Sequence, residues 1–157
     1  MLVPFSHTTS IREINELEQA ELQKYKRSLV QYAASQDLSV IFIETAFRLE
    51  KMPHAKLEVL FAPEENLEQV AIFYAKAFTD MDGDWSTHKK VYNITRKEGG
   101  LFRQIPPSFA YAYVEWSEDE GLAHIIEDED NFDRKVMLEV FGSMIEMDDL
   151  DTRNAKE

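Results

Sequence analysis

The stretch that most constrains the fold runs from Phe109 to Phe132, because it reads as two strands around an acidic turn. Two sets of side chains alternate along the first strand, with Phe109, Tyr111 and Tyr113 on one side and Ala110, Ala112, Val114 and Trp116 on the other. A strand that is apolar on both faces lies between two layers, so we expect Trp116 to be buried at the centre of a module. The second strand has Leu122, His124 and Ile126 on one side and Ala123 and Ile125 on the other. Between the strands, Ser117 to Gly121 holds three acids and a glycine that suit a tight hairpin.

Helical and strand patterns alternate through the first half of the chain. From about residue 15 to residue 36, apolar side chains recur every three or four positions, which predicts an amphipathic helix. The β-branched run from Leu38 to Thr45 is typical of a buried central strand. Residues 55–61 alternate between apolar and polar side chains and predict a half-buried strand, and Leu2 to Phe5 predicts a short first strand.

A second helix is predicted to start at Pro63, since proline is tolerated in the first turn. Its apolar stripe comprises Leu67, Val70, Ala71, Tyr74, Ala77 and Phe78. Residues 85–108 show little periodicity around Gly99 and Gly100 and predict a long loop. After the hairpin, Asp130 or Asn131 can cap a final helix. The predicted buried face of that helix comprises Phe132, Val136, Phe141, Met144 and Ile145. The whole pattern predicts an α+β fold with an antiparallel sheet.

The charge of the chain argues against indiscriminate binding to nucleic acid. The formal net charge is −13 at pH 7, whereas phosphate backbones are bound mainly by Lys and Arg. The charge is unevenly distributed, however. Residues 85–108 carry five Lys or Arg and one Glu, a local balance of +4, and residues 117–130 carry seven acids and no Lys or Arg. There is no apolar run long enough to cross a membrane, and a chain without cysteine has neither disulfides nor zinc–cysteine sites.

Two acidic clusters suggest metal binding by composition but not by spacing. Asp80, Asp82 and Asp84 lack the glycine and the bidentate glutamate at the positions that an EF-hand loop requires. The consecutive acids Glu127 to Asp130 diverge in direction and are more typical of a solvated, helix-capping loop. The glycine-rich phosphate-binding motifs and the G-x-S-x-G nucleophile motif do not occur. We therefore expect neither a metal nor a cofactor.

The segment WSTHKK, residues 85–90, is the best candidate for contact with RNA. An aromatic ring and an imidazole could stack on bases while two lysines meet phosphate. A basic loop that docks on the protein's own acidic hairpin would explain the same residues, and so would a protein partner. The candidate contacts to RNA or to an acidic partner are Trp85, His88, Lys89, Lys90, Arg96, Lys97 and Arg103.

His54 stands at the head of the predicted strand PHAKLEVL. Histidine-triad (HIT) nucleotide hydrolases and transferases place alternate histidines on such a strand, and the middle one attacks phosphorus. Here the alternate positions hold Lys56 and Glu58, which do not supply a nucleophile together with its orienting partner. His54 is therefore expected either to hydrogen-bond to backbone at the strand edge or to keep a ligand or phosphate contact.

Longer segments resemble a known family. The opening VPFSH, the strand VIFIET and the segment PHAKLEVLFAP look like the back half of the HIT-like domain in CwfJ-type, or Cwf-nineteen-like, splicing factors. The segment AIFYAKAFTDMDGDWSTHKK resembles the start of their second conserved C-terminal module, and FAYAYVEWSEDEGLAHIIEDEDNFDRKVMLEVFGSMIEM resembles its end. The resemblance is closest to the branch that joins spliceosomes at the intron-lariat stage. It implies an incomplete HIT-like antiparallel sheet with helices in residues 1–62, followed by a helix–long loop–β-hairpin–helix module in residues 63–157.

The resemblance implies a nuclear scaffold or adaptor in late splicing rather than an enzyme. Its implied partners are spliceosomal proteins, small nuclear RNA or intron lariat RNA, and the lariat debranching enzyme. Only His7 and His54 match HIT-like positions, as vestigial ligand or phosphate contacts. The alternative function is a HIT-fold nucleotide binder or RNA-end hydrolase that uses these two histidines. A third possibility is that the acidic hairpin docks a basic partner segment. Family members carry further strands before VPFSH, so the chain is expected to be a trimmed fragment or to be completed by a separate upstream segment.

Overall fold

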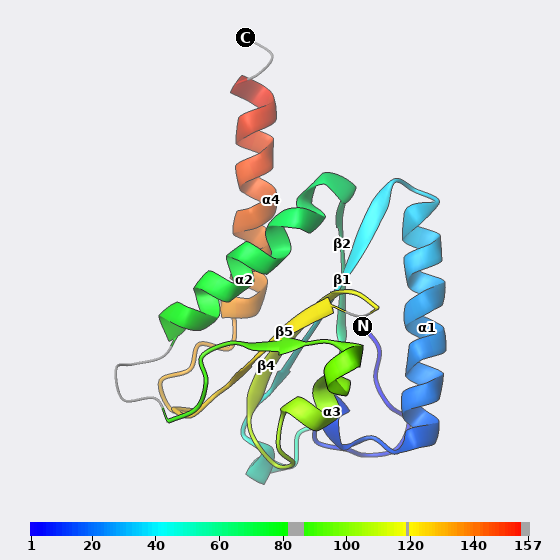
Figure 1. Cartoon of the computed structure of the whole chain (residues 1–157), viewed down its shortest axis with the longest axis vertical. Helices are drawn as coiled ribbons and strands as arrows, with labels where there is room; N and C mark the ends of the chain where they lie inside the picture. Colours follow the sequence, from blue (N-terminus) through cyan, green and yellow to red (C-terminus); the bar gives the residue numbers. More distant parts are fainter. Residues whose placement is uncertain (82–86, 119, 155–157) are drawn as a thin grey trace.

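A five-stranded antiparallel sheet forms the centre of the computed structural model, which describes residues 1–81, 87–118 and 120–154, with side chains up to residue 145. The strands lie in the order β2-β1-β4-β5-β3 (Figure 1). Their bounds are β1 Leu38–Ala46, β2 Glu58–Pro63, β3 Tyr92–Ile94, β4 Tyr111–Ser117 and β5 Glu120–Ile125. The helices are α1 Glu16–Ala34, α2 Leu67–Met81, α3 Gly100–Gln104 and α4 Val136–Asn154. The α+β class predicted from the sequence is confirmed.

The predicted hairpin lies in the middle of this sheet. β4 pairs with β1 on one side and with β5 on the other, so strands from both halves of the chain share one sheet. The register shifts between Glu115 and Ser117, where β4 carries an irregularity of the β-bulge kind. Gly121 lies opposite Glu115, and an added Cβ there would be only 2.6 Å from the carbonyl oxygen of Val114. The glycine is therefore needed for the close approach of β5 to β4.

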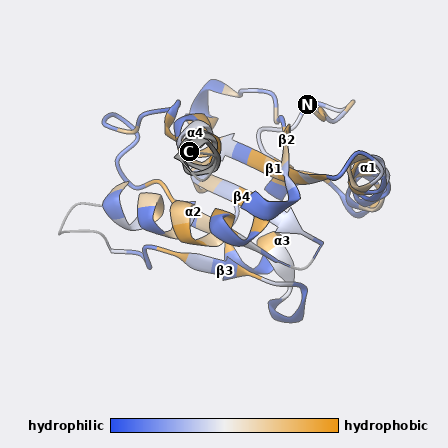
Figure 2. Ribbon diagram, turned by 90° about the horizontal axis from the view of Figure 1, so that it is seen from above, coloured by the Kyte–Doolittle hydropathy of each residue, from blue (hydrophilic) through white to orange (hydrophobic). Residues whose placement is uncertain are grey.

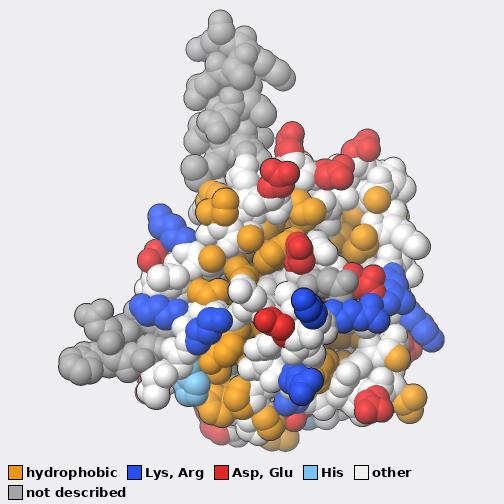
Figure 3. Space-filling view, viewed as in Figure 1, with side chains coloured by type: hydrophobic (Ala, Val, Ile, Leu, Met, Phe, Trp, Pro, Cys, Tyr) orange, Lys and Arg blue, Asp and Glu red, His pale blue; other side chains and the backbone are white. Residues whose placement is uncertain are grey.

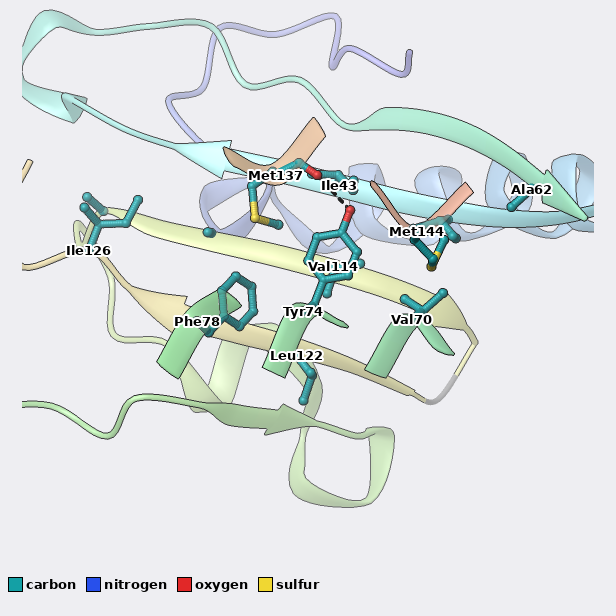
Figure 4. Packing of buried hydrophobic residues seen from close by; sticks show 13 residues of the cluster. Ile43, Ala62, Val70, Tyr74, Phe78, Val114, Leu122, Ile126, Met137 and Met144 are labelled. Atoms are coloured by element: carbon teal, nitrogen blue, oxygen red, sulfur yellow. Dashed lines mark hydrogen bonds between the residues drawn. The ribbon is translucent and has the colours of Figure 1, made fainter. Parts of the chain in front are cut away.

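The two faces of the hairpin are buried by different layers, as the alternation of its side chains predicts. One face packs against α2 and α4, and the core there includes Ile41, Ile43, Ala112, Val114, Leu122, Tyr74, Phe78, Met137 and Met144. Figure 4 shows Tyr74 of α2 pointing toward α4, where its hydroxyl donates a 2.8 Å hydrogen bond to the carbonyl oxygen of Met137. The opposite face carries Tyr111, Tyr113, Ala123 and Ile125, which pack with Leu101 and Ile105.

Helix α1 begins at a well-defined cap and covers the sheet incompletely. The side chain of Asn15 accepts hydrogen bonds from the N–H groups of Leu17 and Glu18, and Glu18 bonds back to the N–H of Asn15, which forms a capping box. Within the helix only Lys26 and Ala33 are buried. Figure 2 shows α1 at the edge of the molecule, beside β1 and β2. Residues of α1 and of the sheet line pockets between the helix and the sheet.

The segment predicted as a long loop contains regular structure in its described part. β3 pairs with β5 at the edge of the sheet, and a 3-10 turn at Arg96–Glu98 leads into α3. The prediction was wrong because elements of three and five residues are too short to show a period in the sequence.

Three predicted element boundaries also differ from the structure. The N-terminal segment contributes one isolated bridge, Leu2 to Leu57, in place of a strand. Pro63 ends β2, and α2 starts only at Leu67 after a 3-10 turn.

The last helix starts at Val136 rather than after a cap at Asp130 or Asn131. The Asp128 side chain accepts a 3.2 Å bond from the N–H of Asn131, and such side-chain bonds to backbone favour turns over helix. None of the helices in the described ranges is long and apolar enough to cross a membrane.

Candidate functional site

The two HIT-like positions lie side by side. The ring centroids of His7 and His54 are 5.1 Å apart, and their planes meet at 70°. Nε2 of His54 donates a 2.9 Å hydrogen bond to the carbonyl oxygen of Pro4, and Nε2 of His7 lies 3.2 Å from that of Met52. His54 thus has the backbone contact expected of a strand-edge histidine. Together the two rings tie the first residues of the chain to the segment before β2.

The alternate positions that follow His54 are paired with each other. Nζ of Lys56 lies 2.7 Å from Oε1 of Glu58, and the lysine side chain is half exposed. Neither side chain is an imidazole, so the alternating histidines of a triad do not continue after His54.

Glu127 holds the start of the basic segment, which the structure describes over residues 87–108. Its carboxylate accepts hydrogen bonds from the backbone N–H of Thr87 at 3.0 Å and of His88 at 2.6 Å, and Nδ1 of His88 lies 2.7 Å away. These bonds, led by that from Thr87, lower the pKa of Glu127 to about 2. Nδ1 of His124 also donates a 2.7 Å bond to the carbonyl oxygen of Lys90. The segment is thus docked on the end of the protein's own hairpin.

The other predicted contact residues are spread along one side of the molecule. The ammonium group of Lys89 lies 5.9 Å from the ring centroid of Tyr92, and Nζ of Lys90 lies 3.4 Å from the carbonyl oxygen of Thr79. Arg96 and Lys97 lie in the 3-10 turn before α3, and Arg103 lies in α3. Figure 3 shows Lys and Arg side chains over this region and toward α1. Trp85 lies outside the described residues, as do Asp82 and Asp84 of the calcium-like cluster.

The acids from Glu127 to Asp130 have separate partners. Glu129 accepts a 2.6 Å hydrogen bond from the N–H of Arg48, whereas Asp130 lies 3.6 Å from the guanidinium group of the same residue. Asp128 bonds to Asn131. In the part of the chain that the structure describes, no three ligating side chains are placed to hold a metal ion.

A pocket beneath α1 is the site that the sequence did not predict. Its volume is about 330 Å³, and it lies between α1, the turn before α3, and strands β4 and β5. Lys26 and Glu115 form an ion pair there, with side chains only 7% and 9% exposed. The hydroxyl of Tyr113 donates to the same carboxylate oxygen. Each residue is a charge within an apolar pattern, because Lys26 continues the spacing of Leu22 and Leu29, and this was the signal available in the sequence.

Charged and hydrogen-bonded side chains surround the pocket. At its mouth, Nε of Arg27 donates a 2.9 Å bond to Glu118, and this bond lowers the pKa of that carboxyl. Deeper in, burial raises the pKa of the Tyr113 hydroxyl. Glu44 of β1 lies in the same layer and accepts hydrogen bonds from the N–H of Ile11 at 2.7 Å and from the hydroxyl of Tyr111. Burial raises the pKa of Glu44 to about 7 despite these bonds.

The chain matches two successive regions of one protein family. Residues 1–75 match the family described as "Protein similar to CwfJ C-terminal". Residues 84–157 match the family described as "Protein similar to CwfJ C-terminus 2". The two matches together span nearly the whole sequence, in the order in which their names number them.

Curated relatives align with nearly all of the chain. It is 28% identical over 148 residues to CWF19-like protein 2 of Danio rerio, a match that covers 94% of the chain and 15% of that relative. The identity to CWF19-like protein 2 of Homo sapiens is also 28%, covering 94% of the chain and 16% of the relative. The identity to Pre-mRNA-splicing factor cwf19 of Schizosaccharomyces pombe is 25%, covering 94% of the chain and 24% of the relative. The chain thus spans less than a third of the length of these relatives. It carries both C-terminal domains of the CwfJ family and belongs to that family, homologous over most of its length to CWF19-like protein 2 and to cwf19.

Proposed function

We propose that this chain serves in pre-mRNA splicing as a non-catalytic scaffold or adaptor that joins the spliceosome at the intron-lariat stage. There it would support disassembly of the lariat spliceosome and debranching of the lariat. Its partners would be spliceosomal proteins, small nuclear RNA or intron lariat RNA, and the lariat debranching enzyme, all within the nucleus. The splicing context is that of the family, and one relative is itself named as a pre-mRNA-splicing factor.

The observation that carries the non-catalytic role is the ion pair between Lys56 and Glu58. Both residues stand where a histidine triad would continue after His54, and each has the other as its partner at 2.7 Å. The hydrogen bonds of His7 and His54 go to backbone carbonyls, so both rings have a structural task. With Lys56 and Glu58 paired to each other, neither supplies the nucleophile together with its orienting partner that a triad needs, which supports a scaffold role.

RNA contact is proposed for the basic segment. Lys89, Lys90, Arg96, Lys97 and Arg103 lie on successive elements from residue 89 to α3, and each offers a cation to phosphate. His88 lies 5.3 Å from the ring of Phe109, which provides an aromatic surface beside the lysines. With its backbone held by Glu127, the segment loses less conformational entropy when it binds.

Binding of the purified chain to single-stranded and branched RNA over a salt series tests this role. We expect Lys89→Glu with Lys90→Glu to weaken binding and to reduce the salt slope by about 0.7 for each phosphate that is no longer neutralised. The matched control is Lys24→Glu with Lys76→Glu, at exposed positions of α1 and α2. If the first pair of changes left both RNA binding and recovery with spliceosomes intact, the contact assignment would be wrong.

The close approach of His7 and His54 favours one second candidate, a nucleotide or RNA-end site of the HIT type. Its test is a hydrolysis assay with nucleoside monophosphates and with capped and branched dinucleotides. Turnover that disappears in His54→Ala would overturn the scaffold role, whereas absence of turnover in the unmodified chain removes this candidate.

A further inference from the structure

The pocket beneath α1 has the size and lining of a small-ligand site. Its volume of about 330 Å³ lies at the lower end of the range for ligand pockets, roughly 300–1,000 Å³. Helices α1 and α3 flank it on one face of the sheet (Figure 1). Apolar side chains line its walls, among them Leu22, Ile94, Leu101 and Phe102. A charged pair lies at its floor, so the pocket combines apolar walls with a few polar groups.

The floor offers hydrogen-bonding groups that the protein leaves unused. Oε2 of Glu115 accepts from both Lys26 and the hydroxyl of Tyr113. Oε1 of the same carboxylate accepts no hydrogen bond from any residue that the structure describes, and both of its lone pairs are open. Lys26 has three N–H donors, of which Glu115 takes one. An acceptor with two open positions therefore lies beside free donors.

A ligand that complements these groups needs two N–H donors to meet Oε1 of Glu115 and, next to them, an acceptor to meet Nζ of Lys26. Guanine has this edge, because its N1–H and N2–H groups stand beside O6. Adenine and cytosine place one amino group beside ring-nitrogen acceptors, and uracil places one N–H between two carbonyls. We propose that the pocket binds a guanine base, with N1–H and N2–H on Oε1 of Glu115 and O6 on Nζ of Lys26.

The walls and mouth suit the rest of a nucleotide. Phe102 provides an aromatic surface, and its ring is supported by the guanidinium group of Arg12 at 5.7 Å from the centroid. Arg27 and Arg96 line the pocket, and Nε and Nη2 of Arg27 both donate to Glu118. Arg96 has an exposed side chain, and its guanidinium group can donate two hydrogen bonds to a phosphate. Arg96 also belongs to the basic segment, so the pocket is continuous with the surface proposed to contact RNA.

The guanine site rests on the proposed function, because a bound base would give the RNA contact a sequence preference. The guanine assignment can still be wrong while the proposed function is right. A scaffold that holds RNA only through phosphates would bind RNA while ignoring mononucleotides. Titration with single nucleotides therefore separates the two.

The experiment is an NMR titration of the full chain with GMP, AMP, CMP and UMP. We expect saturable shifts for GMP at the amides of Gln23, Gly99 and Gly100, which line the pocket. GMP should bind about tenfold more tightly than the other three, as expected for a matched base edge. Shifts that do not saturate, or equal binding of the four nucleotides, would overturn the assignment of guanine.

Gln23→Trp and its control Lys24→Trp test the location without disturbing the buried pair, and Glu115→Gln tests the acceptor itself. Gln23→Trp places a large ring in the mouth of the pocket and should abolish GMP binding, whereas Lys24→Trp, at an exposed position beside it on α1, should leave binding unchanged. Glu115→Gln replaces one acceptor oxygen by an NH₂ donor and should reverse the preference for GMP if it folds. GMP binding that survives Gln23→Trp would show that the nucleotide sits elsewhere.

Competition identifies the source of the base. A short single-stranded RNA with one guanine that displaces GMP from these amides supports RNA as the ligand, provided that the same RNA with adenine does not. GMP binding that resists such competition supports a free guanine nucleotide. Both outcomes require the pocket, and they differ only in what fills it.

Discussion

Lys26 of α1 and Glu115 of β4 form an ion pair beneath the helix, although 89 residues separate them in the sequence. Their side chains are only 7% and 9% exposed. The ammonium group also lies 4.9 Å from the centroid of the Phe42 ring. Because few other residues of α1 are buried, this pair is a principal link between the helix and the centre of the sheet.

Removal of one member of this pair should be strongly destabilising. Lys26→Met keeps the apolar stem but leaves the Glu115 carboxylate buried without its cation. We expect the free energy of unfolding to fall by about 3–5 kcal/mol, measured by urea denaturation. Adding Glu115→Leu to the same chain should restore much of the loss, because both charges are then absent.

The matched control for that variant is Arg27→Met. Arg27 is the next residue along α1, and its ion pair with Glu118 is about half exposed on both sides. Exposed pairs contribute roughly 0–1 kcal/mol, so the control should change stability little. Equal losses from the two variants would mean that burial of the Lys26 pair has no energetic consequence.

Glu44 should make stability depend on pH near neutrality. Its pKa rises from 4.5 to about 7 in the folded chain because burial disfavours the carboxylate. The folded state then binds more protons than the unfolded state between these values, so this group lowers stability as pH rises from 4.5 to about 7. The stability it contributes at acidic pH is lost once pH exceeds the folded pKa. The full effect is on the order of 3 kcal/mol.

Glu44→Gln removes this titration and should flatten the dependence of the unfolding free energy on pH across that window. The other groups that act on Glu44 are the hydroxyl of Tyr111, the N–H of Ile11 and the cation of Lys26, and all three stay in place in the variant. Glu16→Gln, at an exposed position in the first turn of α1, is the control for the general effect of one fewer acid. Parallel stability curves for Glu44→Gln and the unmodified chain would contradict the shifted pKa.

The central strands could be predicted because burial on both faces leaves a period of two in the sequence. Tyr111 and Tyr113 separate from Ala112 and Val114 as that period requires, and the two pairs pack in different clusters. Trp116 follows the alternation as well, but it is only partly buried at the rim of the α2–α4 core. Its indole N–H donates a 3.1 Å bond to Glu120. Replacement of Trp116 by Ala should therefore cost less than the loss of a fully buried tryptophan.

The pocket could not be predicted, for a different physical reason. A period reports which residues share a face, and it carries no information on which distant charge a buried charge meets. The sequence places Lys26 on an apolar helix face and Glu115 in a buried strand, but the pairing arises only when the fold brings the Lys26 side chain of α1 to β4. β3 and α3, which build the opposite wall, are each too short for a periodic signal.

Gly121 of β5 should not tolerate substitution by a residue with a Cβ. A Cβ in Gly121→Ala would lie 2.6 Å from the carbonyl oxygen of Val114, and backbone on that side must shift to accept it. We expect a loss of about 1–3 kcal/mol, measured by urea denaturation. Gly142→Ala is the matched control, because nothing lies within 4 Å of its added Cβ in α4. That control should stabilise the chain by about 0.5–1 kcal/mol, so a loss in both variants would refute the steric explanation.

Glu127 should determine how firmly the basic segment is held against the hairpin. Its carboxylate accepts the backbone N–H groups of Thr87 and His88, and Glu127→Ala removes these acceptors while leaving every Lys and Arg in place. We expect the amide hydrogens of both residues to exchange several-fold faster in the variant, since exchange reports local opening. Asp130→Ala is the control, because its side chain is 96% exposed and lies no closer than 3.6 Å to Arg48.

Because the low pKa of Glu127 follows from the same bonds, the hold on the segment is present above the ordinary carboxyl pKa of 4.5 and is lost as pH falls toward about 2. Unchanged exchange in Glu127→Ala would show that residues outside this contact hold the segment, and the proposed preorganisation for RNA would lose its physical basis.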